Sequence, residues 1–398
     1  MLRNLFSKFN NILIIAFAFL LSFYYIIPQS IALAANTFIL LLSIKNISKI
    51  TSFLPLKWYL SFTGVLMILT LFRFDSTSYL ISSINVSIII LTLMLILKDK
   101  ENILLLINAI SISGLLLCVY ISYKFGYLFG FGRLGDLPGT RIDSSITLGY
   151  IFLYICCMQI CSLFEQKSIV VKVLTSVAIV FTLYLTLLTG TRKALLVPIA
   201  YLLFCLYIKY KRNYFKIFIV IVISIFTIPK VIEYIADNNI LDYKMIERWE
   251  GSLGLIDDKQ FIDDSSLERL DHIEKAKEIF YNNPIFGVGV DKTINYVGTH
   301  PHNNYFTLLS FGGIVLFFSY YWIYLYIIMK WKKIYNLWPQ LYIMILMLLL
   351  SDMGTTSFNI LYFNTMIVLL LIRYKIGNGK EIVNMYNKNS HKYEHASY

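Results

Sequence analysis

The chain consists largely of apolar segments that have the length of a membrane-spanning helix. A helix needs about 20 mostly apolar residues to cross the hydrocarbon core of a bilayer. Twelve segments, two of them short, meet this requirement or come close to it. They are residues 11–28, 30–44, 56–72, 79–97, 102–121, 146–163, 168–188, 193–208, 214–235, 303–329, 338–353 and 359–374. The pattern predicts an all-α polytopic membrane protein with about 12 transmembrane helices.

The composition excludes the common classes of soluble protein. Hydrophobic residues make up 58% of the 398 residues and charged residues 15%, against about 45–50% and about 25% in soluble domains. Such a chain has too little polar surface for a soluble enzyme and is too apolar to be disordered. We interpret the net charge of +12 as Lys and Arg retained at the cytoplasmic side of a membrane, with no nucleic-acid partner. The five cysteines lie in apolar segments, and we expect them to be packing residues.

The distribution of Lys and Arg predicts the orientation of the spans. With a cytoplasmic N-terminus, the cytoplasmic segments hold 21 of these residues and the short outer segments hold six. This is the bias that positively charged loops impose on membrane proteins. An even number of spans then places both termini in the cytoplasm.

The predicted spans divide the chain into four parts. Residues 1–229 form the N-terminal transmembrane helices (about nine spans), and residues 230–302 form one large extracytoplasmic loop. Residues 303–376 form the C-terminal helices (about three spans), and residues 377–398 form a polar cytoplasmic tail that we expect to be disordered. The loop contains 14 of the 23 acidic residues, so it is the main polar module of the chain.

One amphipathic helix is predicted within this loop. Ser266, followed closely by two acidic residues, is typical of a helix start. Apolar residues then recur at helical spacing on one face up to about Tyr281. Asn282-Asn283-Pro284 predicts the end of the helix. The sequence therefore predicts a helix from Ser265 or Ser266 to about Tyr281.

Basic residues occur at the predicted outer ends of the spans, where cations are otherwise scarce. Arg133 and Arg141 lie in a glycine-rich loop that is either an anion clamp or an ordinary turn. Arg192 and Lys193 are adjacent in Thr189-Gly190-Thr191-Arg192-Lys193, and interfacial snorkelling is the alternative to a functional role. Both places are candidates for binding an anion.

Arg269 is a further candidate, in the first turn of the predicted loop helix. A cation near a helix N-terminus opposes the helix dipole, which indicates a use other than helix stability. A surface salt bridge with neighbouring Glu268 or Asp271 is the alternative.

The strongest signal comes at the end of the loop, at the mouth of the tenth span. Two motifs occur there, Phe286-Gly287-Val288-Gly289 and Thr299-His300-Pro301-His302-Asn303-Asn304-Tyr305. A zinc pair of His300 and His302 lacks a further ligand at suitable spacing. A histidine at this place can instead act as a general base near neutral pH, and Asn303 can orient an imidazole or an acceptor hydroxyl.

Residues from Arg269 to about Phe318 resemble the O-antigen ligase/O-antigen polymerase family, which includes Wzy-type polymerases and lipid A-core ligases. The matching pieces are Arg269 with its helix, Asn283-Pro284-Ile285-Phe286-Gly287-Val288-Gly289, His302-Asn303 and Gly313-Ile314. Thr189-Gly190-Thr191-Arg192 resembles the family's arginine-bearing turn, and Arg133 and Arg141 lie where its other extracytoplasmic arginines occur. Ile273 stands where the family commonly has tryptophan, which is a packing difference.

The resemblance implies a GT-C-like fold and metal-independent, inverting glycosyl transfer at the outer face of the bacterial cytoplasmic (inner) membrane. It implies a glycan donor on undecaprenyl diphosphate, an acceptor sugar hydroxyl, no cofactor, and a flippase and chain-length regulator proteins as partners. His302 would be the general base, and Arg269 and Arg192 would bind the diphosphate. Substrate-binding residues would be Arg133, Arg141, Lys193, His300, Asn303, Tyr305, Gly287 and Gly289, and no residue would bind a metal.

The same motifs fit more than one function. We favour polymerisation of repeat units for O-antigen (lipopolysaccharide) or capsule over ligation of a finished polymer to lipid A-core or another acceptor. A lipid-linked oligosaccharide flippase is less favoured, because it needs charges along a central cavity. Asp352, near the end of a span, is the residue that comes nearest to that requirement.

Overall fold

A computed structural model describes residues 2–50, 53–73, 75–129, 133–142, 144–210, 230, 264–354, 358 and 360–394. Within these residues every regular element is a helix, which confirms the predicted all-α class. The elements are α1 Leu2–Phe23, α2 Gln29–Ser43, η1 Ile44–Lys49, α3 Leu54–Arg73, α4 Ser78–Ile96, α5 Lys100–Phe125, η2 Gly126–Leu128, α6 Ser145–Glu165, α7 Ile169–Leu188, α8 Arg192–Tyr210, α11 Asp264–Asn282, α12 Val290–Val297, α13 Asn304–Met329, α14 Trp331–Leu337, α15 Pro339–Ser351, η3 Asp352–Gly354 and α16 Leu361–Glu394.

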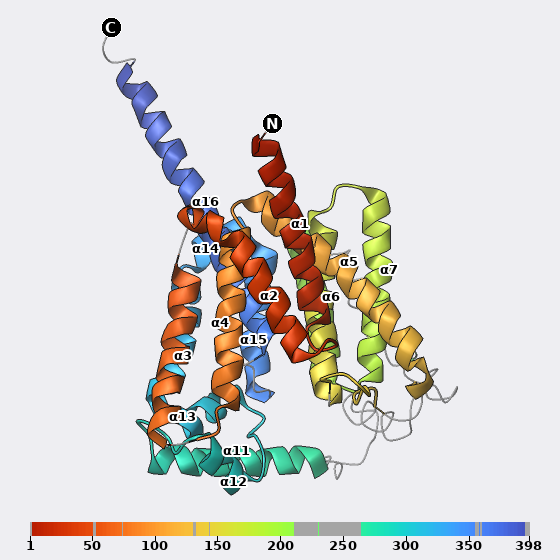
Figure 1. The fold of residues 1–398 in the computed structure, drawn as a ribbon, viewed down its shortest axis with the longest axis vertical. Coiled ribbons are helices and arrows are strands. Elements are labelled where there is room, and N and C mark those ends of the chain that lie inside the picture. Colours follow the sequence, from red (N-terminus) through yellow and green to blue (C-terminus); the bar gives the residue numbers. More distant parts are fainter. Residues whose placement is uncertain are drawn as a thin grey trace.

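The long helices run side by side as a bundle (Figure 1). The start of α1 and the end of α16 lie at the same end of this bundle, and α11 lies across the opposite end with α12 beneath it. We call residues 264–303, which comprise α11, α12 and the loop up to Asn303, the cap. The fold therefore separates a bundle of long helices from a cap of short elements.

Eight of the described helices are long and apolar enough to cross a membrane, which agrees with a polytopic membrane protein. Two further apolar stretches, Ser7–Phe23 and Pro339–Ser351, are shorter. Eleven of the twelve predicted segments coincide with described helices. Residues 211–229 and 231–263 lie outside the described residues, so the segment predicted at 214–235 and the domain boundary at 230 stay predictions.

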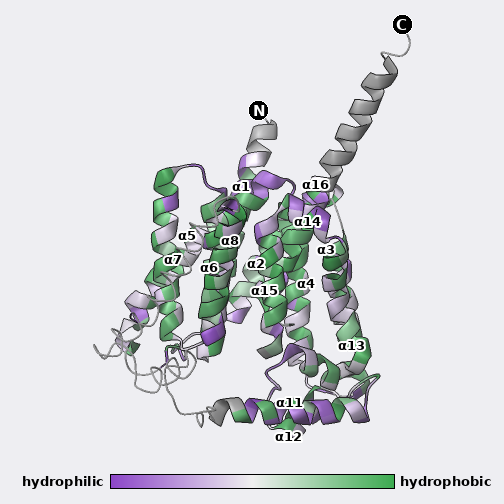
Figure 2. Cartoon of the chain, turned by 180° about the vertical axis from the view of Figure 1, so that it is seen from behind, coloured by the Kyte–Doolittle hydropathy of each residue, from purple (hydrophilic) through white to green (hydrophobic). Residues whose placement is uncertain are grey.

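The surface of the bundle is itself apolar. Figure 2 shows hydrophobic residues along the long helices, whereas α11 carries many hydrophilic ones. Large apolar side chains are exposed along α7, namely Ile169, Val170, Val173, Leu174, Val177 and Val180. Apolar side chains that point away from a protein are stable in contact with lipid tails, so this surface fits a bilayer.

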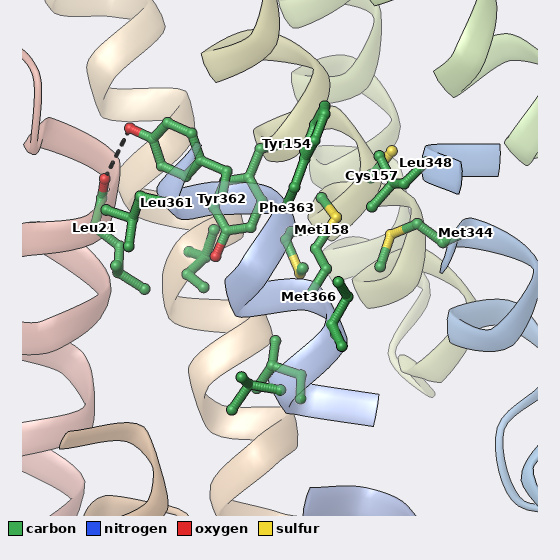
Figure 3. Close-up of a cluster of buried hydrophobic side chains, with 14 of the residues drawn as sticks. Leu21, Tyr154, Cys157, Met158, Met344, Leu348, Leu361, Tyr362, Phe363 and Met366 are labelled. Carbon is green, nitrogen blue, oxygen red and sulfur yellow. Dashed lines mark hydrogen bonds between the residues drawn. The ribbon is translucent and has the colours of Figure 1, made fainter. Parts of the chain in front are cut away.

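Aromatic and sulfur-containing side chains fill the interior of the bundle (Figure 3). The ring of Tyr154 on α6 stacks on Tyr362 of α16 with centroids 4.6 Å apart. The Tyr362 hydroxyl donates a hydrogen bond of 3.1 Å to the Leu21 carbonyl on α1. All five cysteines are buried and free, which confirms their interpretation as packing residues.

The helix predicted in the loop is confirmed as α11, with bounds close to the predicted ones. It begins at Asp264, so Ser266 lies inside the helix and Arg269 in its second turn. It ends at Asn282, directly before Asn283 and Pro284. By contrast, α16 continues as a helix to Glu394. The expectation of a disordered tail is therefore wrong for the backbone of residues 377–394.

Candidate active site

The site is built around a break in α13. At Gly313 the backbone has φ 63° and ψ −160°, a conformation that residues with a side chain rarely adopt. The helix carbonyls freed by the break bind the Phe286–Gly289 motif. Val288 N donates to Ser310 O at 2.9 Å, and Gly289 N donates to Phe311 O at 3.0 Å. The two glycine-bearing motifs of the sequence therefore meet in one packed unit.

The glycines of this unit have a structural reason. Gly287 and Gly289 also have positive φ. A Cβ atom at Gly287 would collide with the backbone of the α13 break, and one at Gly289 would collide with the carboxylate of Asp75. Their predicted contact with substrate stays a prediction, because the contacts described here are all within the protein.

The connection between α3 and α4 fastens the cap to the bundle. Arg73 donates to the carbonyls of Phe311 (2.8 Å), Phe286 (2.7 Å) and Gly287 (3.1 Å). The Asp75 carboxylate accepts a hydrogen bond of 3.2 Å from Val290 N at the start of α12. Arg73 was not among the site residues predicted from the sequence. Its place at the end of a span on the cation-poor side was the available signal.

One face of α11 turns Arg269 and His272 towards the bundle. His272 is 7% exposed and Ala276 is fully buried, and Arg269 lies one turn before His272 on the same face. Arg269 itself is exposed and forms no salt bridge with a described residue. Asp271 pairs instead with Lys275 at 2.7 Å, and Glu268 lies 3.9 Å from His272. The alternative of a local salt bridge for Arg269 is therefore wrong within the described residues.

His302 lies next to this face of α11. Its imidazole is 6.2 Å from that of His272, centroid to centroid, with the planes 35° apart. Among the described residues it is the one non-glycine with positive φ (53°), a strained conformation that is typical of functional sites. Burial, followed by the nearby Arg269, His272 and His300, lowers the pKa of His302 to about 4. The imidazole is therefore neutral at pH 7, as a general base must be before it accepts a proton.

His300 contacts a different residue, Tyr79. Its ring nitrogens lie 2.8 Å (Nε2) and 3.1 Å (Nδ1) from the hydroxyl of Tyr79 on α4. Burial lowers its pKa below the ordinary histidine value. The structure thus turns His300 to Tyr79 and His302 to His272.

Asn303 and Tyr305 fix the start of α13. The Asn303 side chain caps the helix by accepting a hydrogen bond of 3.2 Å from Phe306 N, and its amide donates to Met353 O at 3.0 Å. The Tyr305 hydroxyl donates to Leu349 O at 2.7 Å. Both ends of the Asn303 amide are therefore used within the protein, and substrate contact by these two residues stays a prediction.

A buried carboxylate contacts α13 near its start. Asp352, at the end of α15, is fully buried. Its Oδ2 accepts a hydrogen bond of 2.7 Å from the Tyr321 hydroxyl, and the Asn304 amide donates to Oδ2 at 3.3 Å. A buried charge needs such partners, so Asp352 ties α15 to the start of α13. In the sequence, Asp352 stands out only as a charge near the end of a span.

Charged groups of three elements, α8, α11 and η3, come close together at this end of the bundle. Arg269 on α11 and Asp352 on η3 both act electrostatically on Lys193 of α8 and on Tyr150 of α6. Arg269 also acts on His302. The structure therefore brings three of the predicted site residues, Arg269, Lys193 and His302, into one region.

Arg192 directly precedes Lys193 and is half-buried at the start of α8. The preceding turn has positive φ at Gly190 (62°), and Arg133 braces it by donating to the carbonyls of Thr189 (3.2 Å) and Gly190 (3.4 Å). Arg133 therefore reaches the site through this turn. The predicted Gly130–Gly132 part of its loop lies outside the described residues.

Arg141 lies apart from these residues. Its guanidinium donates to the carbonyls of Tyr24 and of Ile27 (3.1 Å for the latter) and lies 4.7 Å over the Tyr24 ring. Its described contacts join it to the connection between α1 and α2. In the described part of the chain, no group of three or more His, Cys, Asp or Glu residues could hold a metal ion.

Comparison with known proteins identifies part of the chain. No curated protein matches it. The family model of O-antigen ligase matches residues 177–321, just over a third of the chain. The match includes the Arg192 turn, Arg269, His302 and the break at Gly313. It confirms the resemblance to ligase- and polymerase-type glycosyl-transfer enzymes. Residues 177–321 of this multi-spanning membrane protein are therefore similar to the O-antigen ligase family.

Proposed function

We propose that the protein polymerises oligosaccharide repeat units carried on undecaprenyl diphosphate, for an O-antigen or a capsular polysaccharide. The observation that carries this proposal is that Arg269 and His302 of the cap lie close enough to Lys193 of α8 and to each other to interact electrostatically. Two cations and one neutral imidazole are the groups that this transfer needs. The matched family supports glycosyl transfer in general.

His302 serves as the general base. The acceptor sugar hydroxyl attacks the anomeric carbon of the donor from the side opposite the diphosphate, so the configuration inverts. The O–H bond of the acceptor breaks as its proton moves to the neutral imidazole, the new C–O bond forms, and the bond to the diphosphate oxygen breaks. General bases of this kind contribute about 10²–10⁴-fold to rate.

Arg269 and Arg192, with Lys193 beside them, stabilise the leaving diphosphate. Negative charge grows on the diphosphate as its bond breaks, and cations held in position beside the diphosphate stabilise that charge. Arginine suits this role because its planar guanidinium binds two phosphate oxygens at once and stays charged when partly buried. The diphosphate is already a good leaving group, so the scheme uses no metal and no nucleotide.

The site lies at the outer face of the bacterial cytoplasmic membrane in this proposal, within a GT-C-like arrangement. The termini and the cap lie at opposite ends of the bundle, which supports this orientation if the termini are cytoplasmic. A flippase would supply the lipid-linked unit, and chain-length regulators would act on the same polymer. Reporter fusions at Asp258 and after Gly379 should report opposite sides of the membrane, and the same side for both would refute this orientation.

Ligation is the second candidate, because the matched family is described as O-antigen ligase. A ligase would use the same donor chemistry and would transfer the polymer to lipid A-core or another acceptor. The two functions differ in the acceptor alone.

Glycans of cells that lack this protein separate the candidates. Acceptors that carry single repeat units indicate loss of a polymerase, whereas long chains that remain on the lipid carrier indicate loss of a ligase. With purified protein and a synthetic undecaprenyl-diphosphate repeat unit in excess EDTA, we expect chains of several units. No transfer to any sugar acceptor would refute the proposal, and loss of transfer in EDTA alone would refute its metal-free chemistry.

A further inference from the structure

Tyr79 is a residue of the bundle that contacts the cap, and the proposed reaction gives it no role. It lies in the first turn of α4, and its hydroxyl is 2.8 Å from Nε2 and 3.1 Å from Nδ1 of His300. Its ring packs against the rings of Phe311 and Phe358, with centroids 5.7 and 5.5 Å away. The imidazole of His300 is therefore bonded to a hydroxyl whose own ring is held in place by the bundle.

The same part of the bundle holds the cap segment before His302 at two places. At the start of α12, the Asp291 carboxylate accepts a hydrogen bond of 2.8 Å from Ser76 N in the α3–α4 connection. Tyr79 follows Ser76 by three residues and contacts His300, which lies beyond the end of α12. The segment that leads into His302 is therefore attached at its beginning and again directly before the proposed base.

His302 lies between two residues that are each held in place. On one side Pro301 joins it to His300, and a proline restricts both its own backbone and that of the residue before it. On the other side Asn303 caps α13 through a hydrogen bond of 3.2 Å. A residue with a side chain keeps a φ of 53° only where its surroundings determine the backbone conformation. The contact between Tyr79 and His300 supplies that restraint on the N-terminal side of His302.

Resting on the proposed function, we infer that Tyr79 is a positioning residue, which acts through His300 to hold His302 where its imidazole meets the acceptor hydroxyl. Tyr79 does not touch the substrate in this role. A general base must lie within hydrogen-bond reach of the proton that it accepts, and a small misplacement of a reacting group lowers the rate. Loss of the Tyr79 hydroxyl should therefore lower kcat, whereas binding of the donor, which depends on the cations, should persist.

The chain offers a matched control for the loss of a tyrosine hydroxyl. Tyr79→Phe removes the hydroxyl and keeps the ring. Tyr362→Phe does the same to a hydroxyl that donates at 3.1 Å to the Leu21 carbonyl within the bundle (Figure 3). At the other partner, His300→Gln keeps a polar group that can reach Tyr79, and His300→Ala removes it. The double variant of Tyr79→Phe with His300→Ala completes a double-mutant cycle.

The kinetic arm measures kcat and donor KM of the purified full-length proteins with the synthetic undecaprenyl-diphosphate repeat unit. A hydrogen bond within a protein contributes a factor of about 5 to 10. We expect Tyr79→Phe to lose that factor in kcat while its donor KM stays within about twofold of wild type. Tyr362→Phe should keep both values within the same limit. His300→Gln should retain more activity than His300→Ala, and Tyr79→Phe should have no further effect once residue 300 is alanine.

The second arm measures backbone amide hydrogen exchange, which needs no turnover. Peptides that cover residues 298–306 should exchange about 5- to 10-fold faster in Tyr79→Phe than in wild type, because the segment opens locally more often. In Tyr362→Phe the same peptides should exchange at the wild-type rate.

Equal exchange of these peptides in Tyr79→Phe and Tyr362→Phe would overturn the inference, and so would independent losses of kcat in the double-mutant cycle. The exchange arm keeps the inference separate from the proposed function. Failure of the wild type to transfer sugar would refute the function, whereas unchanged exchange in Tyr79→Phe would refute the positioning role of Tyr79.

Discussion

The bundle and the cap use their polar groups differently. Many buried polar side chains of the bundle bond to one another or to the backbone, although the described spans also hold unpaired polar atoms at Asn36, Ser83, Ser122, Tyr154 and Gln159. Asn10 donates to Ile96 O at 3.0 Å, and the hydroxyls of Ser22 and Ser113 lie 2.7 Å apart. In the cap, Arg269 is exposed without a salt bridge to any described residue, and the buried Nδ1 of His272 lacks a partner.

The difference follows from the surroundings of each region. Lipid offers no hydrogen bonds, so an unsatisfied group in a span costs several kcal/mol (about the value for transfer to hydrocarbon). The cap is beyond that constraint and can leave groups free for a ligand. It also retains backbone strain at His302, which the surrounding contacts must offset. Changes to the free polar groups of the cap should therefore reduce the activity. Changes where the cap is attached to the bundle should instead reduce the amount of protein in the membrane.

The largest effect should come from His302. In His302→Ala the acceptor hydroxyl loses its base, so we expect a fall in transfer rate of about 10²–10⁴-fold. His300→Ala should cost less, because His300 is bonded to Tyr79. Both rates are measured with purified protein and synthetic donor. Undiminished chain growth by His302→Ala would refute the role of His302 as the base, and with it the claim that the cap carries the catalytic groups.

Arginine-to-lysine changes should come next. Lysine keeps the charge of Arg269 and Arg192 but cannot bind two phosphate oxygens in a planar fork. Each variant should lose about 10- to 100-fold in donor kcat/KM while its amount in the membrane stays normal. Arg141→Lys is the matched control, because Arg141 contacts the α1–α2 connection. It should change accumulation more than kinetics. Normal kinetics of Arg269→Lys would leave that residue as a surface cation.

Gly289→Ala should act on the attachment of the cap. The new Cβ would collide with Asp75, and the backbone has φ 99°. We expect a loss of about 1–3 kcal/mol in stability, read as a lower thermal midpoint and less protein in the membrane. Gly64→Ala in α3 is the control, because no atom lies within 4 Å of its Cβ position. Equal behaviour of the two variants would contradict the packed unit at the α13 break.

The smallest effect should be that of pH on the reaction rate near neutrality. A base must be neutral to accept a proton, and burial with nearby cations lowers the pKa of His302 to about 4. Donor kcat/KM should therefore be flat around neutral pH and should fall only as pH approaches about 4. An acid limb near about 6.5, the value for an exposed histidine, would show that His302 is solvated when the enzyme works.

The sequence predicted the parts that depend on local pattern. Hydropathy located the described spans, and periodicity located α11. The capping role of Asn303 was also within reach, because asparagine is a preferred N-cap residue. His272 was within reach as well, since it lies three residues after Arg269 and so shares its helix face.

The rest depends on contacts between residues that are far apart in the chain. Arg73 bonds to carbonyls more than 200 residues away, and no local pattern encodes such a pair. A side chain at position 289 would collide with Asp75, which is far away in the sequence. The glycine motif could therefore be recognised in the sequence, but the structural requirement for glycine could not.

If the proposed function is right, the position of α11 across the end of the bundle fixes the depth at which the sugar is transferred. Arg269 and His302 cannot move far from the membrane surface, because the cap is fastened to α3 and α13. Under the proposed function, only the sugar next to the lipid carrier meets these residues. A chain of two units and a chain of fifty present the same bond. The enzyme then has no means of measuring polymer length, and length must be set by how long the product stays near the protein.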